Sequence, residues 1–350
     1  MHGRKSARAC RPCGMRKRHC HPILISNDKN VPLIMRNARV SDTGNFMAIA
    51  VTDENADAVM APEAINLLSH FSIEVTPRTA AKVEDFRALL PAGTRVYVAH
   101  IEGTPIDDMV ATARRLTSEG FAPMPHIPAR GIADVSTLDT WIGRYNEEAG
   151  VERALLLGGG YARPAGDLDS VMSMLETGLF DRYGFKRLHV AGHPEGNRDI
   201  DRDGGTINVD AALRSKHEYA QRTDAKMAVV TQFAFDAKPV IAWAERIFAN
   251  GIDLPIHLGI AGPTKLQTLI KFAISCGVGP SLSILQKRAL DFRKLLVPFE
   301  PTDLVNEIEA YCATHPQSRI EQCHLFPLGG IAASATWANA RAQNGLATAI

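Results

Sequence analysis

The chain has 350 residues, 45% hydrophobic and 22% charged, which is long enough for one large domain or two small ones. Its formal net charge of +1 gives no overall case for binding nucleic acid or a membrane surface, and no run of about 18 apolar residues is present to span a bilayer. The six cysteines have no dense disulfide spacing. We therefore expect a soluble, cytoplasmic protein, and composition leaves self-association open.

Residues 1–22 contain seven lysines and arginines and no acidic residue, which predicts a disordered basic tail. An upstream extension ahead of a start at Met15 or Met35 is an alternative. Cys10 and Cys13, with histidines and a cysteine at 19–21, would supply ligands for one zinc ion, but a second ligand pair and an apolar core are missing, so we assign no metal. Residues 23–66 mix short apolar runs with Asp, Asn and Gly, which predicts an irregular arm on the main domain.

From Ser69 onward, short apolar runs alternate with segments of helical periodicity. Eight such strands and their helices over residues 67–345 predict a (β/α)₈ TIM barrel, with a helical insertion at 280–316 before the last strand. A doubly wound sheet is the competing fold, but no Gly-x-Gly-x-x-Gly motif follows an early strand. The predicted strands are 70–75, 95–100, 122–127, 153–157, 187–191, 228–232, 255–258 and 320–326, and the helical patterns include 107–119, 209–222, 239–250 and 265–276.

Polar residues end six of these strands in succession. Because the carboxyl ends of barrel strands meet at one mouth, we expect a polar site there. Each residue also has a structural interpretation, since a histidine can cap a helix, a glycine run can form a tight turn, and a glutamine can tie a strand to a loop. The residues are Glu74, His100, His126, Gly158 to Gly160, His193 and Gln232.

Glu74 and Gln232 carry the most specific expectations. Glu74 lies in the apolar run 71–75, where burial would raise the pKa of its carboxyl group and keep a proton available at neutral pH. An ion pair with Arg78 is the structural alternative. Gln232 ends a buried apolar run, so its amide needs a partner, either a ligand or a neighbouring loop. The glycines after the fourth strand would let a planar ligand or a phosphate approach the backbone.

Four segments together resemble the methylenetetrahydrofolate reductase family, in the family's order and spacing. They are Phe71-Ser72-Ile73-Glu74-Val75-Thr76-Pro77, Pro125-His126, Ala191-Gly192-His193-Pro194-Glu195-Gly196-Asn197 and Thr231-Gln232-Phe233-Ala234-Phe235-Asp236. The resemblance covers roughly residues 69 to 340. It implies a barrel that holds FAD at the strand ends and uses NAD(P)H to reduce 5,10-methylenetetrahydrofolate to 5-methyltetrahydrofolate.

The resemblance also implies roles for individual residues. Glu74 matches the acid that assists opening of the folate ring, Gln232 the amide that holds the pterin, and Phe272 the aromatic that stacks on folate or nicotinamide. A basic residue near the cofactor phosphates is matched by Arg222, a sensible use of a guanidinium group. The positions that match FAD contacts are His100, His126, Leu157, Gly158, Gly159, Gly160, His193, Asn197 and Arg222.

This chain departs from the family pattern at three places. Gly160 replaces an acid beside the flavin, His193 and Asn197 replace a tyrosine and a histidine, and residues 328–330 lack an arginine expected to meet the glutamate tail of folate. A divergent reductase is the leading hypothesis. The alternatives are a folate-binding barrel that acts in methyl transfer or demethylation without flavin redox chemistry, and a non-catalytic partner protein.

Overall fold

The computed structural model describes residues 65–275 and 298–347. The predicted tail, nearly all of the predicted arm and the first part of the predicted insertion lie outside these residues. Within them, no helix is long and apolar enough to cross a membrane.

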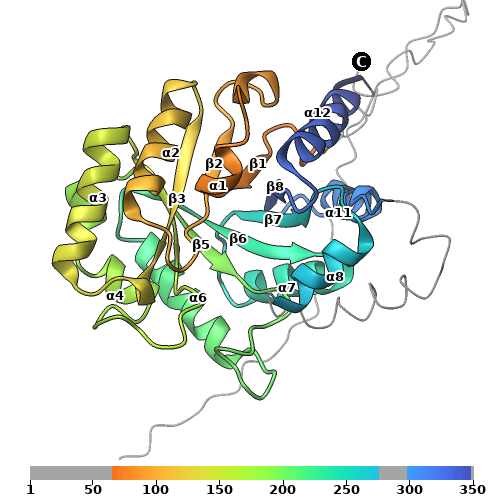
Figure 1. Cartoon of the computed structure of the whole chain (residues 1–350). Helices are drawn as coiled ribbons and strands as arrows, with labels where there is room; N and C mark the ends of the chain where they lie inside the picture. Colours follow the sequence, from red (N-terminus) through yellow and green to blue (C-terminus); the bar gives the residue numbers. More distant parts are fainter. Residues whose placement is uncertain (1–64, 276–297, 348–350) are drawn as a thin grey trace, which may run out of the picture. The chain divides into compact units, whose positions relative to one another are not determined.

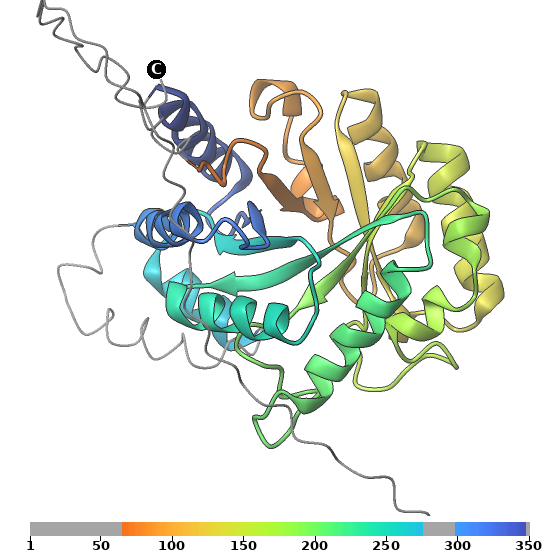
Figure 2. The same cartoon turned by 180° about the vertical axis from the view of Figure 1, so that it is seen from behind.

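Eight parallel strands pair in chain order and close into a barrel, because β1 pairs with both β2 and β8. The predicted (β/α)₈ fold is therefore confirmed, and Figures 1 and 2 show helices surrounding the strands. Strands β4 and β8 have the predicted bounds, while β6 is longer than predicted. The strands are β1 (Ser72–Val75), β2 (Arg95–Val98), β3 (Ala122–Pro128), β4 (Arg153–Leu157), β5 (Arg187–Gly192), β6 (Lys226–Ala234), β7 (Ile256–Ala261) and β8 (Ile320–Phe326).

Helices follow the strands as expected for this fold, and α11 occupies the described part of the predicted insertion. The helical elements are α1 (Pro77–Ala80), η1 (Phe86–Ala88), α2 (Ile106–Ser118), η2 (Ala129–Gly131), α3 (Val135–Ala149), α4 (Val171–Leu175), α5 (Leu179–Arg182), α6 (Ile207–Ala220), α7 (Ala237–Ala249), α8 (Leu266–Ser275), α11 (Thr302–Thr314) and α12 (Ile331–Ala347).

Helix α3 illustrates how local sequence sets these elements. The Asp134 side chain accepts a hydrogen bond from the Thr137 backbone N–H and so satisfies a free donor at the helix start. Gly150 ends the helix at φ 62°, a conformation that glycine adopts without steric cost. Between them, Leu138 and Ile142 share one buried face, which packs the helix onto the barrel.

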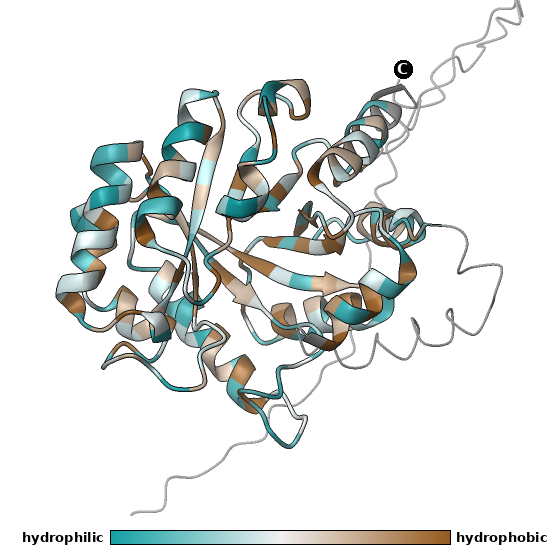
Figure 3. Cartoon of the chain, in the orientation of Figure 1, coloured by the Kyte–Doolittle hydropathy of each residue, from teal (hydrophilic) through white to brown (hydrophobic). Residues whose placement is uncertain are grey.

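Apolar side chains fill the space between strands and helices, while the barrel interior is partly polar. Successive strand residues point to opposite sides, so alternate positions enter the interior. Tyr97, Met124, Leu155 and Val230 form an apolar cluster there. Buried polar residues are interleaved with them, and Figure 3 shows teal segments along the otherwise brown β6 and β7. The polar members are Ser72, His189, His257, Gln322 and His324.

Candidate functional site

A carboxylate flanked by two imidazoles lies toward the carboxyl ends of β1, β3 and β8. The Glu74 Oε2 atom is 3.3 Å from His126 Nε2 and 3.9 Å from His324 Nε2. The side chains of these three residues are 20%, 11% and 0% exposed, respectively. The barrel thus holds a shielded carboxylate, and two imidazole nitrogens lie near the same carboxylate oxygen.

The predicted rise in the pKa of Glu74 is wrong. Burial does raise it, but the hydrogen-bonding capacity of His324 and the charges of His126 and His324 together lower the pKa below its usual value. Burial lowers the pKa of His126 to about 4, against the opposing effect of Glu74. At neutral pH we therefore expect an ionised Glu74 beside a neutral His126. Among the described residues, Glu74 makes no ion pair with Arg78.

Beneath Glu74, a hydrogen-bonded chain continues through the barrel. His324 Nδ1 lies 2.9 Å from Ser72 Oγ, and Gln322 Nε2 donates to the same oxygen at 3.4 Å. Arg95 donates in turn to Gln322 Oε1. The sequence prediction missed these residues. Gln322 and His324 lie two apart in an apolar strand, and this spacing indicates that both polar side chains point into the barrel.

A second set of contacts inside the barrel joins Tyr97 on β2 to the histidines of β5 and β7. The Tyr97 hydroxyl lies 2.6 Å from His189 Nδ1, and the His189 and His257 rings meet edge to face at 4.7 Å. Burial, with charge from Arg95, lowers the pKa of His257 to about 2, and burial together with His257 lowers the pKa of His189 well below its usual value. Both imidazoles are thus neutral inside the barrel.

Gln232 on β6 and His193, the residue directly after the neighbouring strand β5, meet as the sequence predicted for a polar mouth. Burial and the charge of Lys216 lower the pKa of His193 to about 4, while a hydrogen bond with Gln232 opposes this change. Asn197 Nδ2 lies 3.5 Å from His193 Nδ1. The register of β6 against β7 shifts next to Gln232, and Thr231 Oγ1 accepts from the Gly259 N–H at 2.8 Å, which fixes this irregular backbone.

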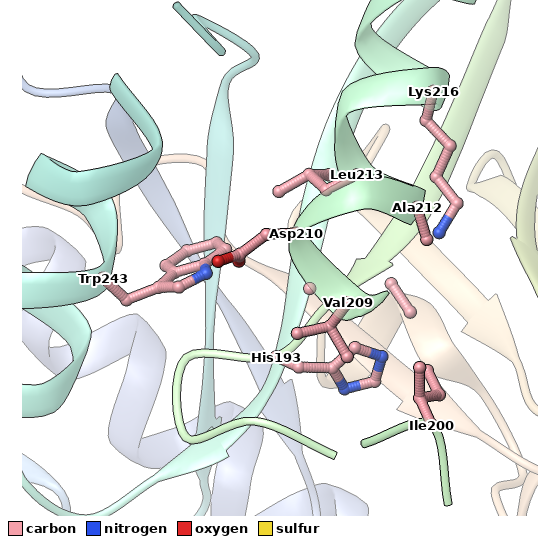
Figure 4. A pocket seen from close by; sticks show the side chains of 10 residues that line it. His193, Ile200, Val209, Asp210, Ala212, Leu213, Lys216 and Trp243 are labelled. Carbon is pink, nitrogen blue, oxygen red and sulfur yellow. The ribbon is translucent and has the colours of Figure 1, made fainter. Parts of the chain in front are cut away.

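A small cavity lies between β5 and α6, and Lys216 is its cationic residue. Figure 4 shows the Lys216 side chain running along α6 toward the loop that carries His193. Burial lowers the pKa of Lys216 to about 8. Asp210 also lines this cavity, but it pairs with Arg246 on α7. Lys216 therefore has no acidic partner among the described residues.

The structure separates Arg222 from the other predicted cofactor residues. It lies between the end of α6 and the start of β6, where the chain enters a strand, so it belongs to the opposite end of the barrel. It is exposed, and its guanidinium stacks on Tyr219 at 4.7 Å from the ring centroid. The sequence pattern placed this residue inside a helix that in fact ends at Ala220.

The glycine loop after Leu157 is anchored from the β3 side. Arg130 donates its backbone N–H to Gly158 O at 2.9 Å and its guanidinium to Gly159 O. A Cβ at Gly159 would lie 2.9 Å from the Tyr161 ring, whereas one at Gly158 or Gly160 would meet no atom within 4 Å. The loop is thus held in place with open space on one side, and Gly160 is exposed.

His100 and Phe272 lie at the same end of the barrel but are not in the Glu74 cluster. The His100 ring stacks on Trp141 of α3 at 5.1 Å, and burial lowers the pKa of His100. This contact is not the helix cap that was the structural alternative for His100, because Trp141 lies inside α3 and not at its end. Phe272, on α8 after β7, is 39% exposed.

Three aromatic rings next to His324, those of Phe326, Phe233 and Phe235, form what we call the aromatic wall, which the sequence analysis did not predict. The Phe326 ring lies 4.8 Å from His324 and 5.5 Å from Phe233, and Phe233 in turn lies 5.5 Å from Phe235. These rings belong to an apolar cluster that includes Leu266 and Leu269 of α8. Phe233 is buried, whereas Phe326 is half-buried, so Phe326 is the ring that can offer the mouth an apolar face beside Glu74 and its histidines.

No group of three or more His, Cys, Asp and Glu side chains in residues 65–275 and 298–347 is arranged to hold a metal ion. The chemistry available at the described mouth therefore rests on one carboxylate, several neutral imidazoles, an amide and one lysine.

Comparison with known proteins identifies the fold. No protein-family model matches the chain. A solved structure of an uncharacterized Clostridium thermocellum protein, which binds two copies of 5-methyl-5,6,7,8-tetrahydrofolic acid, is similar at a TM-score of 0.51 and 14% identity over 79% of this chain and 98% of that one. Dihydropteroate synthase from Thermus thermophilus is similar at a TM-score of 0.38 and 13% identity over 77% of this chain and 91% of that one, which is too distant for a structural argument.

Proposed function

We propose that the carboxyl end of this barrel binds a reduced folate and acts on its one-carbon unit, the reaction being reduction of 5,10-methylenetetrahydrofolate with NAD(P)H. The observation that carries this proposal is the Glu74 carboxylate, with His126 and His324 within 3.9 Å of one of its oxygens, at the mouth that also holds Gln232. The folate bound by the Clostridium thermocellum barrel supports the substrate class.

Gln232 suits recognition of a pterin, because its amide offers a donor and an acceptor side by side, as the edge of the pterin ring does. Its present partner is His193. Phe326 of the aromatic wall would pack against the flat ring system. A folate held this way would have its polar edge and its apolar face satisfied by different strands.

Glu74 would act as an anion rather than as a stored proton. Opening of the methylene bridge produces a positively charged iminium, and a carboxylate in a shielded site stabilises nearby positive charge more strongly than in water. The proton needed for ring opening would come from solvent. Neutral His126, whose Nε2 lies 3.3 Å from Glu74, would relay it by accepting a proton at one ring nitrogen as it donates from the other. The lowered pKa of Glu74 supports its part as an anion.

The residues at the mouth also fit a flavin. Lys216, which lacks an acidic partner among the described residues, can meet a phosphate group, and Gly158 and Gly160 leave open space beside the loop after β4. His193 and Asn197 lie on the same side of the barrel as Lys216. FAD bound there would supply the hydride-transfer chemistry between NAD(P)H and the folate.

A second candidate is a folate-binding barrel that transfers or removes a methyl group without flavin redox chemistry. The loop after β4 favours it in one respect, because Gly158, Gly159 and Gly160 provide no acidic side chain beside a flavin. The two candidates share the folate and differ in the cofactor.

The absorbance spectrum of the purified protein, followed by anaerobic titration with NAD(P)H and then with methylenetetrahydrofolate, tests the proposal. We expect flavin absorption, bleaching by NAD(P)H, and recovery on addition of the folate. Lys216→Ala should weaken FAD binding, whereas Arg222→Ala, at the other end of the barrel, should not. Folate binding with no affinity for FAD would favour the second candidate, and binding of neither ligand would refute both and leave a non-catalytic partner protein.

A further inference from the structure

We propose that His324 is a positioning residue for Glu74, held as the neutral tautomer with its proton on Nε2 by a hydrogen-bond chain that starts at Arg95, toward the opposite end of the barrel. The chain runs from Arg95 through Gln322 and Ser72 to His324. Its members come from three adjacent strands, β2, β1 and β8.

The direction of the chain is set at one end by Arg95. A guanidinium is a donor only, so its contact with Gln322 Oε1 fixes which way the Gln322 amide points. The Gln322 NH₂ group then donates to Ser72 Oγ at 3.4 Å. The Ser72 hydroxyl can then donate its own proton to His324 Nδ1 at 2.9 Å, so the imidazole proton lies on Nε2.

The contact between His324 and Glu74, at the other end of the chain, requires the hydrogen bonds to run in the same direction. Glu74 has a lowered pKa and is an acceptor when ionised, and His324 Nε2 lies 3.9 Å from its Oε2 atom. The opposite tautomer would turn a nitrogen lone pair toward a carboxylate in a buried site, where an unpaired polar contact costs free energy. Arg95, which can only donate, and ionised Glu74, which can only accept, therefore require the same tautomer of His324.

Neighbouring groups do not reverse this arrangement. The Tyr97 hydroxyl also interacts with Ser72, but its own proton goes to His189 Nδ1 at 2.6 Å, and the 2.9 Å contact with His324 Nδ1 is the short contact open to the Ser72 proton. His126 Nε2 faces the same Glu74 oxygen and needs a proton there for the same reason. A proton on each Nε2 atom, 3.3 and 3.9 Å from Glu74 Oε2, would favour the anionic form of Glu74 by electrostatic attraction, since neither nitrogen has a formed hydrogen bond in the described structure. The consequence for catalysis rests on the proposed function, whereas the tautomer does not.

The tautomer can be measured directly. Two-bond ¹H–¹⁵N correlation spectra of protein labelled with ¹⁵N-histidine distinguish a pyridine-type from a pyrrole-type ring nitrogen, and His324→Asn assigns the signals by their loss. At about pH 8, above the ordinary imidazole pKa, we expect a pyridine-type Nδ1 and a pyrrole-type Nε2. A protonated Nδ1 in the parent protein would overturn the proposal.

Gln322→Glu tests whether the Arg95 end sets the direction. A carboxylate at this position still accepts from Arg95 but can no longer donate to Ser72, so the Ser72 proton turns toward it and His324 Nδ1 must become the donor. We expect the Nδ1 signal to change from pyridine type to pyrrole type. Cys323→Ala, on the outward face of the same strand, should leave the spectrum unchanged.

An unprotonated Nδ1 in a folded Gln322→Glu protein would also overturn the proposal, and the parent spectrum decides the matter if this variant does not fold. The expected tautomer in a protein that binds neither flavin nor folate would leave the positioning chain standing and remove the proposed reaction.

Discussion

Three histidines buried in the barrel make the protein sensitive to mild acid. His126 and His257 have pKa values of about 4 and about 2, and the pKa of His189 is well below its usual value, because burial opposes protonation of each ring. In an unfolded chain the same imidazoles titrate near pH ~6.5. Between that pH and the folded-state pKa the unfolded chain binds more protons, so stability is lost as pH falls.

The size of the effect follows from these values. At pH 5, about 1.5 units below the unfolded pKa, each histidine that stays neutral in the folded state contributes a loss of about 2 kcal/mol. For His126, His189 and His257, together with His193, whose pKa is also about 4, the loss is on the order of 8 kcal/mol, comparable with the whole stability of many domains, ~5–15 kcal/mol. The lowered pKa of Glu74 adds a further loss only below its unfolded value of about 4.5.

Urea unfolding at 25 °C, followed by circular dichroism at several pH values between 7.5 and 5, measures this loss. The slope of the unfolding free energy should approach about 5 kcal/mol per pH unit near pH 5, equivalent to about four protons, because His193 titrates in this range as well. His257→Met should reduce the slope by about one proton, and the exposed His70→Met should leave it as in the parent protein. A free energy of unfolding that stays constant over this range would show that the barrel imidazoles are accessible to protons, and would refute the reasoning.

Three further predictions concern single substitutions. Glu74→Gln should leave reduction of the flavin by NAD(P)H intact but slow folate turnover by about 10²–10³-fold, the loss expected when a charge-stabilising group is removed. Normal turnover in stopped-flow assays would remove Glu74 from the mechanism. Gly160→Asp, where the added side chain has open space, should lower the flavin midpoint potential on the order of 30 mV, or about 1.4 kcal/mol. The reduced ring tends toward an anion, which the added carboxylate would repel. An unchanged or higher potential would place residue 160 away from the flavin. Gly259→Ala should lower the free energy of unfolding by about 1–3 kcal/mol, since its Cβ would lie 2.6 Å from Gln232 O; equal urea midpoints for Gly259→Ala and the unobstructed Gly158→Ala would contradict this.

The resemblance located the mouth of the barrel better than it located individual partners. Gln232 and His193 meet, and Glu74 meets His126, as expected for residues at the carboxyl ends of strands in one barrel. Arg222 does not join them, because it follows the last turn of α6, and the carboxyl end of a barrel helix lies at the opposite end from the carboxyl ends of the strands. Lys216, one and a half turns earlier on α6, points into the cavity instead.

The sequence by itself determined the alternation of strands and helices, because apolar periodicity and strand length are local properties that a reader can count. Eight alternations of this kind leave few ways to bury every apolar face other than a closed barrel. Only the tertiary structure decided the charge of Glu74. Burial alone predicts a raised pKa, but His324, in the last strand of the chain, lies across the strand junction where β8 closes against β1. A pKa depends on distances between side chains in space, and no spacing within one strand can reveal a partner that barrel closure supplies.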